Sequence, residues 1–399
     1  MLTYLRLTCQ VLIFLHFRYS KCMAYYIASK DEEKEILKKL EMRQNAETAR
    51  IKRYLAMPDL SRTPGNPLRD IVEKAKSTPS LKDFDDIDIP EIIDTRILFD
   101  LFDFPADHPA RSKSDTYYAD DTHVLRTHDT VMWYYYLNLP EVKEKIGQGE
   151  AVGVVCYGKV FRKDEIDRKH MNIFHQFGGL YLQPDSMGIV PIEELRKVLS
   201  QIVKSLFGEN VKYRFLDDTF PYTDPSLQVE VEVNGEWIEI LGGGMPKKSS
   251  LSKMGIEGYN GWAFGFGLER LAIISMELPD IRLLWSSDER VTKQLKLGTK
   301  FVEVSKYPPI VRDISFVVKN SFVPNDYFDI VRETAPEIVE QVELLDKYEN
   351  VEKFGSGMIS YAFRITYRSL DRTLTSNEID NIHKKLEEAT KKNYEATVR

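Results

Sequence analysis

The stretch VFRKDEIDRKHMNIFHQFGGLYL, from Val160 to Leu182, has the pattern of a β-hairpin. The pair Val160-Phe161 leads into a loop of mixed charge, and a second strand-like run begins at Phe174. Arg162 stands at the base of this hairpin, where a strand would hold its guanidinium in a fixed place for bidentate contact with a phosphate. Taken alone, the pattern fits a surface hairpin with solvated charges equally well.

Two distant stretches favour a binding site over a plain surface hairpin. GWAFGFGLERLAII, residues 261–274, has glycines that allow close backbone approach, followed by a helix with Arg270 in its first turns. GEWIEILGGGM, residues 235–245, reads as a strand that carries Glu239, a carboxylate able to hold a magnesium ion that bridges phosphates. The simpler alternatives are a helix with an exposed Glu–Arg ion pair and a strand carboxylate that faces solvent.

Length and composition predict a globular protein of two or three domains, since the chain has 399 residues, 43% of them hydrophobic and 29% charged. The net charge of −7 argues against general attraction to nucleic acid, so any such contact must come from local patches. Cys9, Cys22 and Cys156 are too few and too scattered for a disulfide framework or a zinc site. They indicate a reducing compartment.

The first 22 residues differ from the rest, because they include Arg6, Arg18 and Lys21 but no acidic residue. Their apolar run is too short to span a bilayer. The segment fits a mitochondrial transit peptide and an over-called start codon with Met23 as the true start equally well. We therefore expect a cytoplasmic protein, with the mitochondrial matrix as the alternative, and no membrane partner.

The remaining chain divides into three parts. Residues 31–55 are strongly charged and predict a solvated helical arm, and connectors are expected at residues 61–67 and 79–90. Residues 92–295 contain aromatic, strand-like runs with few helices between them, which predicts an antiparallel sheet.

The part that follows Gly298 alternates strands and helices. Strands are predicted at VRDISFVV and SYAFRITYR, and helical segments at residues 325–334, 336–342 and 376–394. Two β–α halves in about 100 residues suggest a ferredoxin-like split βαβ domain, so the fold class is α+β. In the second strand, Arg364 and Arg368 share one face and are candidates for RNA contact. The alternative is that they pair with nearby acidic residues on a solvated sheet.

At this point the chain resembles a known family. FRKDE together with GFGLER resembles motifs 2 and 3 of class II aminoacyl-tRNA synthetases, and HPARSKSDTYY, LRTH, FHQ and FPYTDPS are similar to phenylalanyl-tRNA synthetases. KYPPIVRDISFVV through FRITYRSLDRTLTSNEI resembles their ferredoxin-like anticodon-binding domain. Both modules in one chain resemble the single-chain, mitochondrial type. The resemblance implies an N-terminal arm at 1–84, a catalytic domain at 85–297 and an anticodon-binding domain at 301–399.

The resemblance implies a phenylalanine–tRNA ligase that uses ATP and Mg²⁺, with tRNA(Phe) as its partner. Arg162 and Arg270 are implied to be catalytic, and Glu239 is the implied metal ligand. The residues implied to bind ATP are Arg162, Asp164, His170, Phe174, Glu239 and Arg270. Those implied to bind the amino acid are His128, Thr130, Gln176, Phe220, Tyr222, Ala263 and Phe264. Arg364 and Arg368 are implied to contact tRNA. A monomer without a separate β subunit is expected, with a homodimer as the alternative.

Five positions depart from the family's usual pattern. Thr130 stands for a Ser, Trp133 for a Gln and Tyr222 for a Phe. Gly178 replaces a Glu that helps to hold the substrate ammonium, and Gln228 replaces a second acidic residue near the metal. These departures leave open how the ammonium is held and how many metal ions bind. They also keep two alternatives open, a paralogue that adenylates another amino acid and a non-catalytic tRNA-binding protein.

Overall fold

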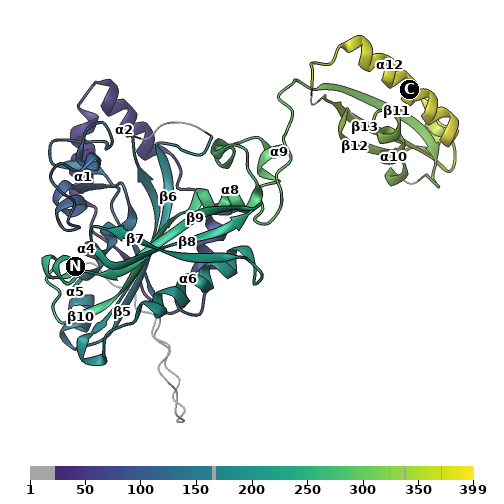
Figure 1. Cartoon of the computed structure of the whole chain (residues 1–399). Helices are drawn as coiled ribbons and strands as arrows, with labels where there is room; N and C mark the ends of the chain where they lie inside the picture. The colour runs from purple at the N-terminus through teal and green to yellow at the C-terminus, as the bar shows by residue number, and fades with distance from the viewer. Residues whose placement is uncertain (1–22, 164–167, 323, 337, 370) are drawn as a thin grey trace, which may run out of the picture. The chain divides into compact units, whose positions relative to one another are not determined.

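The computed structural model describes residues 23–399 except 164–167, 323, 337 and 370. The chain forms two compact units, one that ends at Phe301 and one from Val302 to Arg399, and each is described by itself (Figure 1). Within the described residues, no helix combines the length and apolar character that crossing a membrane requires.

The first unit is built on an eight-stranded sheet. In spatial order its strands are β1 (Tyr25–Ile27), β2 (Asp85–Asp88), β5 (Val152–Phe161), β6 (Ile173–Pro184), β10 (Tyr259–Gly267), β9 (Glu236–Pro246), β8 (Thr223–Val233) and β7 (Tyr213–Phe220). The pairings from β5 to β7 are all antiparallel, which confirms the predicted antiparallel sheet. Strands β1 and β2 extend it in parallel pairings. A small separate sheet pairs β3 (Ile92–Asp94) with β4 (His123–Leu125).

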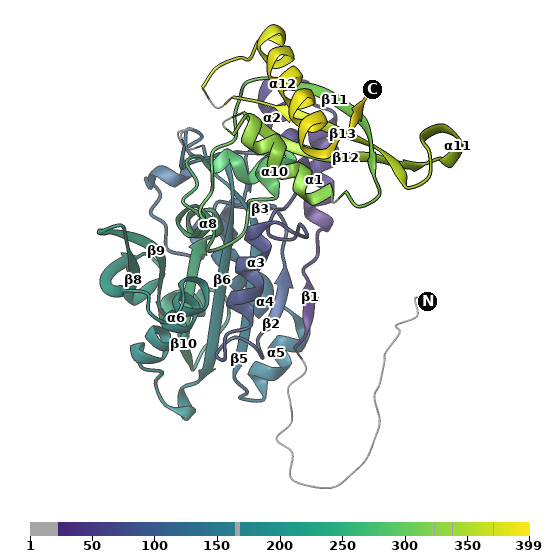
Figure 2. The same cartoon turned by 90° about the vertical axis from the view of Figure 1, so that its right-hand side faces the viewer.

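The helices of this unit are α1 (Asp31–Glu41), α2 (Ala46–Ala56), α3 (Pro67–Lys76), α4 (Met132–Leu137), α5 (Pro140–Gly147), α6 (Ile192–Phe207), α7 (Lys248–Lys253), α8 (Leu268–Met276) and α9 (Glu289–Thr292). Helix α3 packs against α6 and α8, and these three helices cover one face of the sheet (Figure 2). Helix α4 packs on the opposite face, where Trp133 and Tyr136 join a buried cluster with residues of β5 and β6. The sheet is therefore covered on both faces near β5 and β6.

Two segments of the N-terminal part differ from the sequence prediction. Residues 31–55 form helices α1 and α2, but they are not a solvated arm, because Ile36, Leu40 and Ile51 are buried in a cluster with β3 and the hairpin strands. The expected connector at residues 79–90 contains strand β2. Its buried carboxylates have partners from elsewhere in the chain, since Lys76 and Tyr136 contact Asp86 and Asp85 at 2.6 and 2.7 Å.

The second unit has a four-stranded antiparallel sheet and two main helices. Its elements are β11 (Ile310–Lys319), α10 (Pro324–Thr334), β12 (Val339–Glu349), α11 (Val351–Phe354), β13 (Met358–Tyr367), α12 (Ser376–Tyr394) and β14 (Thr397–Val398). The strand order β12-β13-β11-β14 is that of the predicted ferredoxin-like split βαβ fold. The helix predicted at 336–342 is wrong, because β12 begins at Val339. Most of this edge strand is exposed, so it lacks the alternation that marks a half-buried strand.

Candidate active site

A cavity of about 730 Å³ opens in the first unit between the β5–β6 hairpin, strands β9 and β10 and the start of α8. This volume lies within the range typical of small-molecule sites. Every predicted ATP- and amino-acid-binding residue that the structure describes lines it. These residues are His128, Thr130, Arg162, His170, Phe174, Gln176, Phe220, Tyr222, Glu239, Ala263, Phe264 and Arg270. Asp164, also predicted, lies outside the described residues.

The predicted hairpin positions the phosphate-binding candidate. Strands β5 and β6 pair with Val160 opposite Phe174, so Arg162 lies just beyond the end of β5. The Nε of Arg162 donates to the carbonyl oxygen of Thr127 at 3.1 Å. Its guanidinium carbon lies 5.1 Å from the centre of the Phe174 ring. A carbonyl and an aromatic face therefore hold the guanidinium at the cavity wall, while the side chain as a whole remains exposed.

Helix α8 brings the third predicted stretch to the same cavity. The Nη1 of Arg270 donates to the backbone oxygen of Glu239 at 3.1 Å and lies 3.7 Å from its carboxylate. Both side chains are about half exposed, at 50% and 51%, which leaves them accessible to a ligand. The neighbouring Glu269 is buried, so the simpler alternative of an exposed Glu–Arg pair in this helix is wrong.

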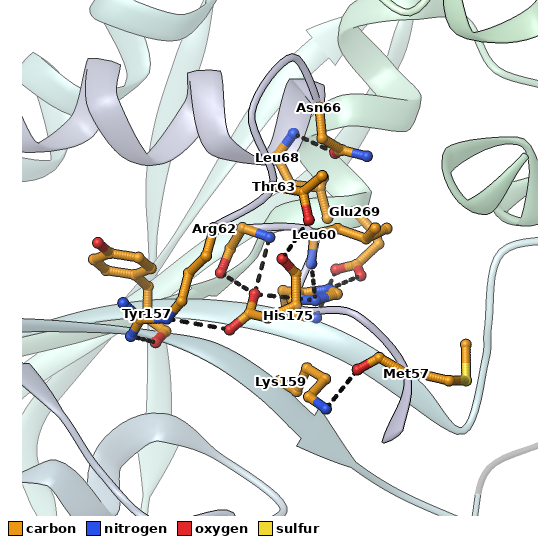
Figure 3. A network of polar contacts seen from close by, with 12 residues as sticks. Met57, Leu60, Arg62, Thr63, Asn66, Leu68, Tyr157, Lys159, His175 and Glu269 are labelled. Carbon is orange, nitrogen blue, oxygen red and sulfur yellow. Dashed lines mark hydrogen bonds and ion pairs between the residues drawn. The ribbon is translucent and has the colours of Figure 1, made fainter. Parts of the chain in front are cut away.

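Glu269 instead anchors the helix to the hairpin. Its carboxylate accepts hydrogen bonds from the backbone N–H and the Nδ1 of His175, at 2.8 and 2.6 Å. The Nε2 of His175 in turn accepts a hydrogen bond from the backbone N–H of Leu60 at 3.0 Å (Figure 3). Both side chains are buried. This network fixes the helix that carries Arg270 relative to strand β6, and sequence reasoning did not find it.

The amino-acid end of the cavity begins at the segment before α4. The backbone N–H of Asp129 donates to the Oε1 of Gln176 at 3.0 Å. The ring of His128 stacks on Phe104 with centroids 5.8 Å apart. Burial, together with the positive charge of Arg162, lowers the pKa of His128 to about 3. His128 is therefore a neutral imidazole near pH 7.

An aromatic pocket adjoins these polar groups. Phe220 and Tyr222 stack with centroids 6.2 Å apart, and Tyr222 meets Phe102 and Trp133 edge to face at 5.5 and 5.7 Å. Burial raises the pKa of Tyr222, and a hydrogen bond with the Thr130 side chain opposes this increase. The Tyr222 hydroxyl therefore has a partner inside the pocket, unlike the phenylalanine usual at this position.

Ala263 and Phe264 do not present their side chains to the same space. They are neighbours in β10, and successive side chains of a strand point to opposite faces of the sheet. The Phe264 ring stacks in a row with Phe177, Trp262 and Phe266, at centroid distances of 6.1, 5.9 and 6.2 Å. Both residues line the cavity, but only one of them can turn its side chain toward a bound amino acid.

Asp129 is a cavity residue that sequence reasoning missed. Its side chain is buried, and within the described residues its Oδ2 has no hydrogen-bond partner. Burial raises the pKa of this carboxyl group to about 7, against the opposing charges of Arg126 and Arg162. The available signal was an acidic residue beside His128 in a chain that lacks the expected acid at Gly178.

The predicted metal ligand was tested against its surroundings. Within the part of the chain that the structure describes, no group of three or more His, Cys, Asp or Glu side chains could hold a metal ion. Glu239 alone lines the cavity with an exposed carboxylate. Protein-bound Mg²⁺ is usually held by one or two carboxylates plus substrate phosphates. One carboxylate therefore fits an ion that arrives with ATP.

The two arginines predicted to contact tRNA lie in the second unit. Arg364 makes two hydrogen bonds of 2.8 Å to the carboxylate of Asp313. Arg368 donates to Glu340 at 3.0 Å and to the backbone oxygen of Tyr307 at 2.6 Å. These contacts match the alternative interpretation of paired charges on a sheet. Contact with tRNA through this face stays a prediction.

Two family models match the chain. The tRNA synthetases class II core domain (F) matches residues 54–295, and the ferredoxin-fold anticodon binding domain matches residues 305–399. Similar proteins include the chloroplastic/mitochondrial phenylalanine–tRNA ligase of Arabidopsis thaliana, 37% identical over 78% of this chain and 72% of that protein. The mitochondrial enzyme of Mus musculus is 35% identical over 78% and 74%, and that of Saccharomyces cerevisiae is 31% identical over 79% and 83%. The chain therefore belongs to the single-chain phenylalanine–tRNA ligases, class II tRNA synthetases with a ferredoxin-fold anticodon-binding domain.

Proposed function

We propose that this chain activates phenylalanine with ATP and transfers it to tRNA(Phe). The observation that carries this proposal is that one cavity joins the phosphate-binding candidates Arg162, Arg270 and Glu239 to an aromatic pocket around Phe220 and Tyr222. Membership of the phenylalanine–tRNA ligases supports the same reaction.

In the first step, the carboxylate of phenylalanine attacks the α-phosphorus of ATP, which gives phenylalanyl-adenylate and pyrophosphate. Arg162 would stabilise the charge that develops on the α-phosphate, because Thr127 and Phe174 already hold its guanidinium in position. His170 would contact the outer phosphates, and the adenine would lie between Phe174 and Arg270. In the second step, a terminal ribose hydroxyl of the tRNA attacks the activated carbonyl.

No side chain needs to act as a covalent nucleophile in this scheme. Catalysis would come from placing the carboxylate next to the phosphorus and from fixed charges around the phosphates. A magnesium ion, when bound at Glu239, would supply further positive charge for the phosphate oxygens.

The amino-acid pocket would recognise phenylalanine mainly by its ring. Phe220 and Tyr222 offer aromatic surface, and edge-to-face packing adds a little energy beyond burial. Gln176, Thr130 and the neutral His128 supply hydrogen-bonding groups at the polar end. Ala263 leaves room because its side chain is small.

The second unit would bind the anticodon, as its family model implies. The face that bears Arg364 and Arg368 is our candidate surface, although tRNA phosphates would then have to replace their present acidic partners. Similar single-chain enzymes are named mitochondrial, which supports a mitochondrial location over the cytoplasm expected first. We propose a monomer that needs no separate β subunit.

ATP–pyrophosphate exchange measured with each of the twenty amino acids tests this function, followed by charging of tRNA(Phe). We expect exchange with phenylalanine and charging of that tRNA. Exchange with another amino acid alone would identify a paralogue with a different substrate. Binding of tRNA without any exchange would identify a non-catalytic binding protein.

A further inference from the structure

Asp129 occupies space that a side chain on strand β6 would otherwise fill. A Cβ atom built on Gly178 would lie 2.2 Å from the Oδ2 of Asp129. Gly265, directly opposite Gly178 in strand β10, would place a Cβ 3.2 Å from the Oδ1. Two paired glycines therefore form a floor against which the carboxylate lies, and no larger residue could stand at Gly178 unless Asp129 moved.

The position of this carboxylate is costly without a partner. Asp129 is 4% exposed, and within the described residues its Oδ2 accepts no hydrogen bond. Arg126 directs hydrogen bonds to the backbone oxygens of Lys159 and Ile89, at 2.7 and 3.2 Å. A buried carboxylate with an oxygen left unpaired is destabilising. Its retention beside a ligand cavity points to a cationic ligand group.

We propose that Asp129 binds the ammonium group of the amino-acid substrate, in place of the acidic residue that is missing at Gly178. The inference rests on the proposed function, in which phenylalanine enters this cavity. The ammonium is the only cation of that substrate, and the rest of its pocket is aromatic or neutral. Gln176, hydrogen-bonded to the Asp129 backbone, lies beside the same carboxylate.

Replacement of Asp129 by asparagine keeps the shape of the side chain and removes its charge. We expect KM for phenylalanine in the exchange reaction to rise about 100-fold or more, because the ammonium would lose a buried counter-charge. KM for ATP should stay within about twofold. The matched control Asp83→Asn removes an exposed carboxylate and should leave both constants unchanged.

Two competitive inhibitors separate a lost charge contact from a damaged pocket. 2-Phenylethylamine carries the ammonium without the carboxylate, and 3-phenylpropionate carries the carboxylate without the ammonium. Asp129→Asn should weaken inhibition by the amine about as much as it raises KM for phenylalanine, while inhibition by the acid stays equal or improves. Equal weakening of both inhibitors would assign Asp129 a structural role and overturn the inference.

The pH dependence of kcat/KM for phenylalanine gives a second readout. The carboxyl group of Asp129, with its pKa raised to about 7, must be ionised to bind the cation. Below that pH, kcat/KM should therefore fall about tenfold per unit. The other ionisable groups facing it are Arg126, Arg162, Cys156 and Tyr222, which keep their charge state near pH 7, and His128 stays neutral. In Asp129→Asn this fall should disappear.

Relocating the carboxylate completes the test. Asp129→Ser frees the space beside Gly178, and Gly178→Glu in that background restores an acid from the other strand. We expect the double variant to regain at least tenfold in kcat/KM over Asp129→Ser, whereas Gly178→Glu alone should be impaired by crowding. Unchanged phenylalanine kinetics in Asp129→Asn would refute the inference alone. A wild-type protein without phenylalanine-dependent exchange would refute the proposed function as well.

Discussion

Replacing Arg162 with alanine tests the placement of the phosphate site. The guanidinium has two neighbours that locate it before any ligand binds, the backbone oxygen of Thr127 at 3.1 Å and the Phe174 ring at 5.1 Å. Loss of one such preorganised contact to a developing charge commonly reduces kcat about 100- to 1,000-fold, or about 3–4 kcal/mol. We expect a loss of that size in phenylalanine-dependent exchange.

The same contacts predict a small effect on stability. Arg162 is exposed, and the variant would lose one hydrogen bond and one cation–π contact. Each of these contributes about 1 kcal/mol or less at an exposed site. The free energy of unfolding should therefore fall much less than the activation barrier rises. Thermal unfolding of both proteins measures the first quantity, and exchange kinetics measure the second.

Two further variants sharpen this comparison. Arg162→Lys keeps the charge but loses the planar fork, so its activity should lie between those of the wild type and the alanine variant. Arg96→Ala removes an equally charged but exposed side chain paired with Asp94, and should leave exchange unchanged. A folded Arg162→Ala protein with near-wild-type exchange would show that Arg162 does not bind the reacting phosphate.

Three other predictions follow from the structure. A protein that ends at Phe301 should retain phenylalanine activation within about twofold and lose most tRNA charging, and unimpaired charging would contradict the role of the unit that begins at Val302. Tyr222→Phe should raise the ratio of kcat/KM for phenylalanine over tyrosine up to about tenfold, because tyrosine's buried hydroxyl would lose a partner; an unchanged ratio would exclude Tyr222 from selection. Glu269→Gln should lower the free energy of unfolding in urea by about 1–3 kcal/mol, since one amide oxygen cannot serve both donors of His175 as the carboxylate does; unchanged stability would show that the network contributes little.

Local patterns were sufficient for the main elements of the fold. The apolar runs around Val160 and Phe174 predicted the hairpin that the structure contains. In the second unit, the alternation from Tyr361 to Tyr367 placed the aromatic residues on the buried face, where they lie. These elements have one apolar and one polar face, so their own sequence carries the necessary information.

Elements stabilised by distant partners could not be predicted in this way. Strand β2 has the sequence DDID, and its acidic residues are acceptable in a buried strand only because Lys76 and Tyr136 reach them from other helices. The N-terminal helices look solvated because most of their residues are charged, and only their contacts show that Ile36 and Leu40 are buried. In each case the deciding information lies outside the segment.

The candidate site shows the same division. Arg162, Arg270 and Glu239 stand in recognisable motifs, and the structure brings them to one cavity. Asp129 stands in no such motif as an acid, because its environment depends on the absence of a side chain at Gly178. A residue whose place is created by a glycine on another strand becomes visible only when both positions are seen together.

The shared space between Asp129 and Gly178 also limits how this pocket can evolve. A carboxylate fits on the turn before α4 or on strand β6, but the 2.2 Å separation leaves no room for side chains at both positions. Any single substitution that moves the acid from one strand to the other passes through a pocket with no carboxylate or with a steric clash. The two positions are therefore epistatic, and lineages with the acid on different elements would be separated by a fitness valley rather than by a neutral path.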